Sequence, residues 1–166
     1  MKHPERIELA PGYSISRIIT GLWQVADIEK EDGSMDLGPA ASALVDYAES
    51  GFDTFDMADH YGSAELIAGH ARRKMQENDS ANQPSSQARF HTKWCPKPGE
   101  MTPQKVREGV LLSAERLDTQ QIDLMQFHWW NYEHPQYLDA MEGLQVLKEE
   151  GIIRHLGLTN FDTDHL

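Results

Sequence analysis

The stretch GFDTFDMADHYG, residues 51–62, predicts how the rest of the chain is arranged. A short apolar strand ends on Asp56, a polar turn then carries Tyr61, and a helical pattern starts near Ser63. In proteins that alternate strands and helices, reactive groups are displayed at the carboxyl ends of the strands. Asp56 and Tyr61 are therefore expected together at one such end.

The same alternation of strand and helix continues on both sides of this stretch. Strands are expected at residues 17–23, 52–56, 88–93, 122–127 and 152–158. Helices are expected at residues 39–50 and 63–76, from Thr102-Pro103 onward, and at 135–150, with another starting after residue 160. In the helix at 135–150, the residues expected to face inward are Leu138, Met141, Leu144 and Leu147.

Short buried strands between helices imply a parallel sheet with right-handed crossovers. The first strand is followed by Gly21-Leu22-Trp23-Gln24, which is not a glycine-rich phosphate loop, so a β/α barrel is favoured over a doubly wound dinucleotide fold. A complete (β/α)8 TIM barrel needs eight strands and about 250 residues. We therefore expect an α/β fold in which the 166 residues form one partial barrel domain with about the first five β/α units. Such a segment is expected to expose the edges of its first and fifth strands, together with apolar helix faces.

Two further segments complete the outline. Two short runs around Pro11-Gly12 predict an N-terminal β-hairpin. Polar loops are expected at residues 26–38 and 77–87.

The charge balance narrows the range of partners. The net charge of −12 and the pI of about 5.0 argue against binding to nucleic acid or to an anionic membrane. Cys95 is the single cysteine of the sequence, so no intrachain disulfide is possible. The N-terminus has no apolar signal core and no stretch reaches the roughly 20 apolar residues of a membrane span, which together favour the cytoplasm without excluding an organelle.

Polar residues follow successive strands at Asp56, Tyr61, Lys93 and His128. A lysine near a tyrosine favours the phenolate, so the tyrosine could exchange a proton near neutral pH. Asp56 would orient the lysine, and His128 could polarise a substrate oxygen by donating a hydrogen bond. Alone, each residue has an ordinary alternative: a helix cap, a packed aromatic, a solvated lysine or a core histidine. The case for a site rests on the four together.

Aromatic residues also fall just beyond strand ends. We expect an aromatic-walled pocket for an apolar carbonyl compound, lined by Trp23, Trp94, Trp129 and Trp130, with ordinary loop packing as an equal alternative. Cys95 is interpreted as an incidental cysteine rather than a reactive thiol.

From about Gly21 onward, the chain resembles the aldo-keto reductases. The resemblance rests on residues 51–65, on Thr92-Lys93-Trp94, on residues 117–130 and on residues 151–161. It implies a barrel closed at its bottom by an N-terminal hairpin, and reduction of aldehydes and ketones with NADP(H) and without a metal.

The resemblance also implies roles for individual residues. Tyr61 would donate the proton, Lys93 and Asp56 would support it, and His128 would orient the substrate. The cofactor would contact Asp56, the segment Gly21-Leu22-Trp23 and the carboxamide-binding pair Thr159-Asn160.

Two other functions stay open. The chain could be a truncated or non-catalytic barrel that acts as a binding or regulatory protein. It could also be a metal-dependent hydrolase that uses Asp56, His60 and His128.

Overall fold

The computed structural model describes residues 3–26, 36–78 and 88–166. Within these residues, a five-stranded parallel sheet has the order β3-β4-β5-β6-β7, the same order as in the sequence. Its strands are Thr20–Gly21, Thr54–Asp56, Arg89–Trp94, Ile122–His128 and Ile153–Thr159. The helices between them are α1 (Leu37–Glu49), α2 (Ala64–Asn78), α3 (Pro103–Arg116) and α4 (Tyr137–Glu149).

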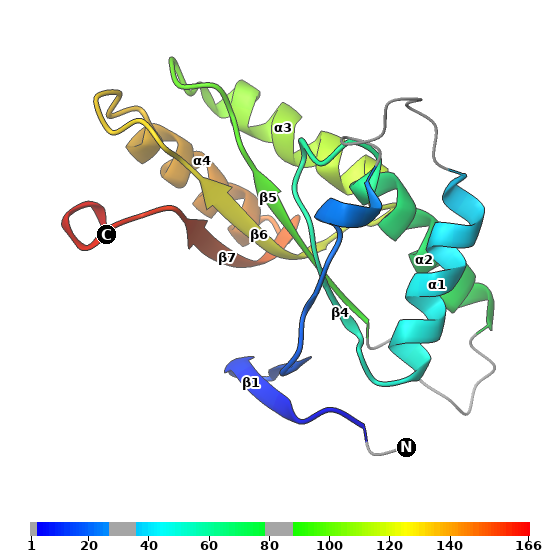
Figure 1. Cartoon of the computed structure of the whole chain (residues 1–166). Helices are drawn as coiled ribbons and strands as arrows, with labels where there is room; N and C mark the ends of the chain where they lie inside the picture. Colours follow the sequence, from blue (N-terminus) through cyan, green and yellow to red (C-terminus); the bar gives the residue numbers. More distant parts are fainter. Residues whose placement is uncertain (1–2, 27–35, 79–87) are drawn as a thin grey trace.

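The helices lie on one face of the curved sheet, as in the wall of a partial barrel (Figure 1). The core is formed where their apolar sides meet the outer face of the strands, around Phe55, Phe90, Val110 and Leu144. The predicted α/β architecture with about five β/α units is therefore confirmed.

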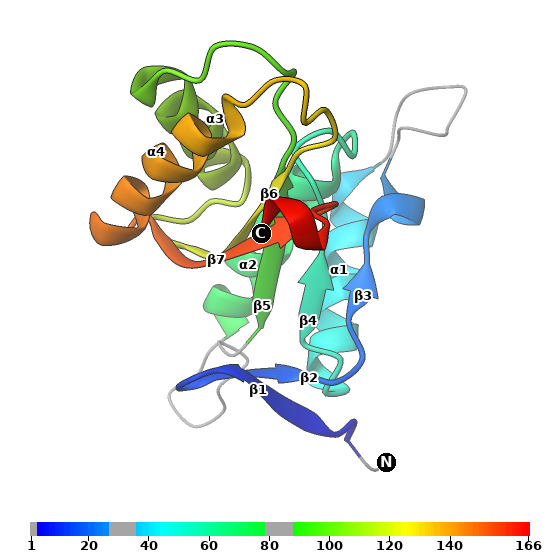
Figure 2. The ribbon, with the colours of Figure 1, turned by 90° about the vertical axis from the view of Figure 1, so that its left-hand side faces the viewer.

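The predicted N-terminal hairpin is also present. The strands β1 (Arg6–Ala10) and β2 (Tyr13–Ser16) pair antiparallel and lie across the amino-terminal ends of the barrel strands (Figure 2). Tyr13 is fully buried beneath the sheet, and its hydroxyl lies 2.9 Å from Nε2 of His91 on β5. The carboxyl ends of the strands lie at the opposite end of the sheet, where loops connect them to the helices.

Side chains alternate along β5 and β6, and this alternation decides which ones can reach the interior of the barrel. On β5, Thr92 and Trp94 point outward: Thr92 hydrogen-bonds Glu65 of α2, and the Trp94 ring lies directly above Gly109 of α3. Lys93, between them, points inward to Asp56. The inner face of the sheet and the hairpin enclose an open hollow of about 510 Å³, which Asp56 also lines.

Several bounds differ from the sequence prediction. The first barrel strand is only Thr20–Gly21, and Trp23–Val25 forms a turn of 3-10 helix, η1. Helix α1 starts at Leu37 because the Asp36 carboxylate accepts a hydrogen bond from the Gly38 amide and caps it.

The sequence prediction was also partly wrong about which residues of α4 face inward and about the helix expected after residue 160. On α4, Leu138 is 54% exposed, and Ala140 takes the inward position instead. Only a short 3-10 turn, η4 (Thr163–His165), follows β7. Most of the loops predicted at residues 26–38 and 77–87 lies outside the described residues.

Within the described residues, β3 and β7 are the edge strands of the sheet. Beside β7, an apolar hollow of about 480 Å³ is lined by Phe127, Met141, Leu144, Leu156 and Leu158, among others. The expected exposure of strand edges and apolar surface is thus observed. No helix in the described part of the chain is long and apolar enough to span a membrane.

Candidate active site

An ion pair between β4 and β5 forms the centre of the candidate site. Nζ of Lys93 lies 2.6 Å from Oδ2 of Asp56 and donates a second hydrogen bond to the carbonyl oxygen of Met57 at 2.8 Å. The amide of Gln126 on β6 donates to the other oxygen of Asp56 at 3.0 Å. Because both carboxylate oxygens are engaged, Asp56 holds the ammonium group at a fixed place on the inner rim.

Tyr61 follows β4 in the loop that leads into α2, and its ring lies beside the ammonium group. Nζ of Lys93 is 5.2 Å from the centroid of the phenol ring, a distance at which a cation is attracted to the π-face. Trp23 packs edge-on against the same ring, with centroids 4.5 Å apart. Tyr61 is half-buried, so its side chain is held by packing while it remains accessible.

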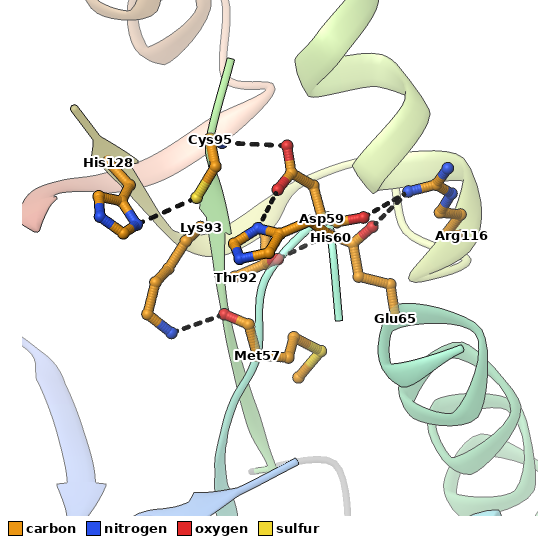
Figure 3. Close-up of polar contacts among 9 residues, drawn as sticks. All are labelled: Met57, Asp59, His60, Glu65, Thr92, Lys93, Cys95, Arg116 and His128. Atoms are coloured by element: carbon orange, nitrogen blue, oxygen red, sulfur yellow. Dashed lines mark hydrogen bonds and ion pairs between the residues drawn. The ribbon is translucent and has the colours of Figure 1, made fainter. Parts of the chain in front are cut away.

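His128 ends β6 and faces the thiol of Cys95, with 3.1 Å between Nδ1 and Sγ (Figure 3). Burial lowers the pKa of His128, and the neighbouring His60 and Lys93 add to this effect, so the imidazole is neutral at neutral pH. Burial raises the pKa of the Cys95 thiol to about 12, so the thiol keeps its proton. A protonated thiol donates to Nδ1, which leaves the hydrogen of the imidazole on Nε2 as a donor for a ligand.

A second layer of polar residues holds the loop after β4. The Asp59 amide donates to the Lys93 carbonyl at 2.9 Å, and the Cys95 amide donates to Oδ2 of Asp59 at 3.0 Å. Arg116 of α3 donates to the Asp59 carbonyl and pairs with buried Glu65, whose pKa is raised by burial (Figure 3). The loop is therefore fixed from both β5 and α3.

Apart from Asp56, the residues expected to contact a cofactor lie at the two edges of the sheet. At the β7 end, the Thr159 hydroxyl contacts the Gln126 side chain at 3.3 Å, and the Asn160 amide donates to the Trp129 carbonyl at 3.0 Å. At the β3 end, Gly21 is exposed and Leu22 is fully buried, so Leu22 presents its backbone rather than its side chain. These groups lie on either side of the Asp56–Lys93 pair.

The structure does not place all four tryptophans at the pocket. Trp23 contacts Tyr61, and half-exposed Trp130 lies 5.1 Å from the His128 ring. Trp94 and Trp129 are instead buried in the core, 5% and 1% exposed, and both pack near Phe127. The expectation of a pocket wall overlooked strand alternation: because Lys93 and His128 point inward, the residues next to them point outward.

The trio considered for a metal-dependent hydrolase is not assembled. Among the described residues, Asp56, His60 and His128 do not form a group with potential ligand atoms within metal-binding reach of one another. Asp56 is engaged with Lys93, and His60 lies against Asp59, with Nδ1 and Oδ1 3.0 Å apart.

Sequence reasoning missed Gln126 on β6, which links Asp56 on β4 to Thr159 on β7. One signal was present: Gln126 lies two residues before His128 on the same strand and therefore faces the same side. Asp59 was missed because its role depends on contacts between loops.

Comparisons with known proteins identify a matching family. The model of the aldo/keto reductase family matches residues 17–166. Two curated relatives come from Escherichia coli. One is named NADH-specific methylglyoxal reductase, 27% identical over 92% of this chain and 51% of its own length. The other is named methylglyoxal reductase, 28% identical over 100% of this chain and 53% of its own length. The chain thus spans about half the length of the curated relatives it matches.

Solved structures show the same fold at lower identity. A thermostable aldo-keto reductase in complex with the inhibitor epalrestat superimposes with a TM-score of 0.77 at 23% identity, covering 98% of this chain and 56% of the other. A Bombyx mori aldo-keto reductase in complex with NADP superimposes with a TM-score of 0.75 at 20% identity, covering 99% and 53%.

Proposed function

This chain belongs to the aldo/keto reductase family, and we propose that the protein reduces aldehydes or ketones to alcohols with Tyr61 as the proton donor. The observation that carries the proposal is the Asp56–Lys93 ion pair of 2.6 Å beside the Tyr61 ring. The related methylglyoxal reductases make small 2-oxoaldehydes the first substrates to assay.

Bound nicotinamide cofactor would supply the hydride for the carbonyl carbon. The Thr159 hydroxyl and the Asn160 amide are donors and acceptors suited to a carboxamide, and Trp23 supplies an aromatic surface at the opposite edge of the site. These polar groups fit a nicotinamide group, so we propose that they bind it.

Tyr61 would give its hydroxyl proton to the carbonyl oxygen as the alcohol forms. The ammonium of Lys93 stabilises the phenolate that remains, because opposite charges attract strongly in a partly buried site. Asp56 and Gln126 hold the lysine in place, and Nε2–H of His128 donates to the same carbonyl oxygen and orients it. Proton donor, charge partner and orienting group would thus meet at one substrate atom.

We propose NADPH as the preferred cofactor, with NADH as the alternative. Solved relatives from Bombyx mori and Klebsiella pneumoniae are described in complex with NADP, whereas one curated relative is named NADH-specific. Parallel titrations of NADPH and NADH, followed by tryptophan fluorescence, would rank the two. The absence of quenching by either cofactor would favour a non-catalytic binding role.

The decisive experiment is carbonyl-dependent NADPH oxidation by the full-length protein. Tyr61→Phe should lower kcat by about 10²- to 10⁴-fold, the usual contribution of general acid–base catalysis, while cofactor binding is kept. Tyr47→Phe is the matched control because Tyr47 is 50% exposed on α1, away from the site. Wild-type turnover in Tyr61→Phe would show that the assigned proton donor is wrong.

A further inference from the structure

A second group of reactive side chains converges on the rim next to Tyr61. Asp59 and His60 belong to the loop after β4, and Cys95 follows β5. Each offers one potential ligand atom, and these three atoms lie within 4.8 Å of one another. Figure 3 shows His128 facing the Cys95 thiol from the side opposite Asp59, with Nδ1 3.1 Å from Sγ.

The backbone around this group is fixed before any ligand arrives. The Asp59 amide is bonded to the Lys93 carbonyl, the Cys95 amide to Oδ2 of Asp59, and the Asp59 carbonyl to Arg116. Oδ1 of Asp59 lies 3.0 Å from Nδ1 of His60. Hydrogen bonds to neighbouring elements therefore hold the backbone of this group in place.

We propose that Asp59, His60 and Cys95 form a zinc site, with solvent in the fourth coordination position. Thiolate, imidazole and carboxylate are the ligands that Zn²⁺ takes in proteins. Around one tetrahedral ion, such ligand atoms lie roughly 3.3–3.6 Å apart, as follows from metal–ligand distances of about 2.0–2.3 Å. The 3.0 Å between Oδ1 of Asp59 and Nδ1 of His60 and the limit of 4.8 Å among the three ligand atoms require only small side-chain rotations.

Coordination and charge favour zinc over a hard cation. The thiol releases its proton to solvent as the sulfur binds the metal, and no electrons are transferred. The thiolate and the Asp59 carboxylate then balance the charge of Zn²⁺. The nearby ammonium of Lys93 is already paired with Asp56, which limits its repulsion of the ion. Mg²⁺ prefers an octahedral shell of oxygen ligands, which this group does not offer.

Zinc at this place would block carbonyl reduction, and this consequence alone rests on the proposed function. With its thiol proton lost on metal binding, Cys95 would no longer donate to Nδ1 of His128, the residue assigned to orient the substrate oxygen. The metal would also lie close to Tyr61, whose ring centroid is 4.9 Å from that of His60. The site would therefore make the activity sensitive to zinc.

Co²⁺ provides a direct test because sulfur ligation produces a thiolate-to-cobalt absorption band. Cys95 is the only cysteine in the sequence, so such a band reports on this residue alone. We expect one equivalent of Co²⁺ to give the band, one equivalent of Zn²⁺ to abolish it, and excess Mg²⁺ to leave it unchanged.

Two variants and a control define the ligands. Cys95→Ser should abolish the band and weaken Zn²⁺ binding at least ~100-fold in equilibrium dialysis, because even residues that only support a ligand contribute 10- to 100-fold. His60→Ala should also weaken binding at least ~10-fold, and its exposed side chain makes misfolding no concern. His134→Ala is the matched control, because His134 is exposed and outside the group.

The outcomes separate the site from the function. No thiolate band, or a band and affinity unchanged in His60→Ala, would overturn the zinc site. One-to-one zinc binding without inhibition of carbonyl reduction would leave the site standing and refute the predicted block. A protein that binds zinc but reduces no carbonyl would contradict the proposed function and not the metal site.

Discussion

Protonation of His91 should make the protein lose stability in mild acid. His91 is 2% exposed on the inner side of β5, and its Nε2 lies 2.9 Å from the buried Tyr13 hydroxyl. Burial raises the pKa of Tyr13 above its usual range, so Tyr13 donates the hydrogen bond and His91 accepts it as a neutral imidazole. The cavity beneath the barrel is therefore built for the uncharged form of His91.

The size of the effect follows from the pKa of His91. Burial lowers it from 6.5 to about 4 and outweighs the opposing effects of Asp123 and Asp56, while Lys93 and Arg89 add smaller lowering effects. Below pH 6.5, His91 is protonated in the unfolded chain but stays neutral in the folded chain. The free energy of unfolding therefore falls as the pH falls from about 6.5 to 4. The loss is about 2 kcal/mol at pH 5 and reaches about 3 kcal/mol below pH 4, at roughly 1.4 kcal/mol per pH unit.

Urea unfolding at pH 7.5 and pH 5.0 measures this loss. His91→Gln keeps an acceptor for Tyr13 but cannot titrate, so its loss of stability between the two pH values should be about 2 kcal/mol smaller than that of the wild type. Other histidines titrate equally in both proteins and cancel in the comparison. The exposed His134→Gln should behave like the wild type. Equal losses in wild type and His91→Gln would refute the assignment.

Two further predictions concern helix packing and capping. Gly69→Ala should cost about 3 kcal/mol in urea unfolding, because a Cβ at Gly69 would lie 2.2 Å from the Arg116 carbonyl oxygen where α2 meets α3. Gly21→Ala, where no atom lies within 4 Å of the added Cβ, should change stability by less than about 0.5 kcal/mol; equal effects would contradict the packing argument. Thr102→Ala should cost about 1 kcal/mol, because the Thr102 hydroxyl accepts the Lys105 amide hydrogen at the start of α3, and Thr102→Ser should restore most of it if the cap is responsible.

The sequence predicted most reliably those features that depend on neighbours in the chain. The Pro11-Gly12 turn specified the hairpin, and Thr102-Pro103 marked the first turn of α3. The alternation of apolar strands and amphipathic helices specified the order of the sheet. The bounds of short strands were harder to predict. In the segment predicted as the first strand, only Thr20 and Gly21 pair with residues of β4.

Contacts between strands and between loops were the features that a single sequence does not display. The Cys95–His128 contact joins residues 33 positions apart, and Asp59 acts through backbone groups of β5 and α3. The core placement of Trp94, by contrast, was within reach of sequence reasoning. Assigning Lys93 to the interior already requires Trp94 to face the helices, where Gly109 leaves space for its ring.

Different structural features position the proton-transfer residues and the proposed zinc ligands at this rim. The two groups can therefore be changed separately by mutation. Lys93 is opposite Gln126 in the register of β5 and β6, and Gln126 is opposite Gly157 on β7, where a Cβ would press on Gln126 at 3.3 Å. The positions of the proton-transfer residues thus depend on strand register. A slip of one residue would turn their side chains to the other face of the sheet. His60 instead lies on an exposed turn, and none of the contacts of the Asp56–Lys93 pair passes through it. Substitution of His60 should therefore change metal binding while the ion pair beside Tyr61 stays in place.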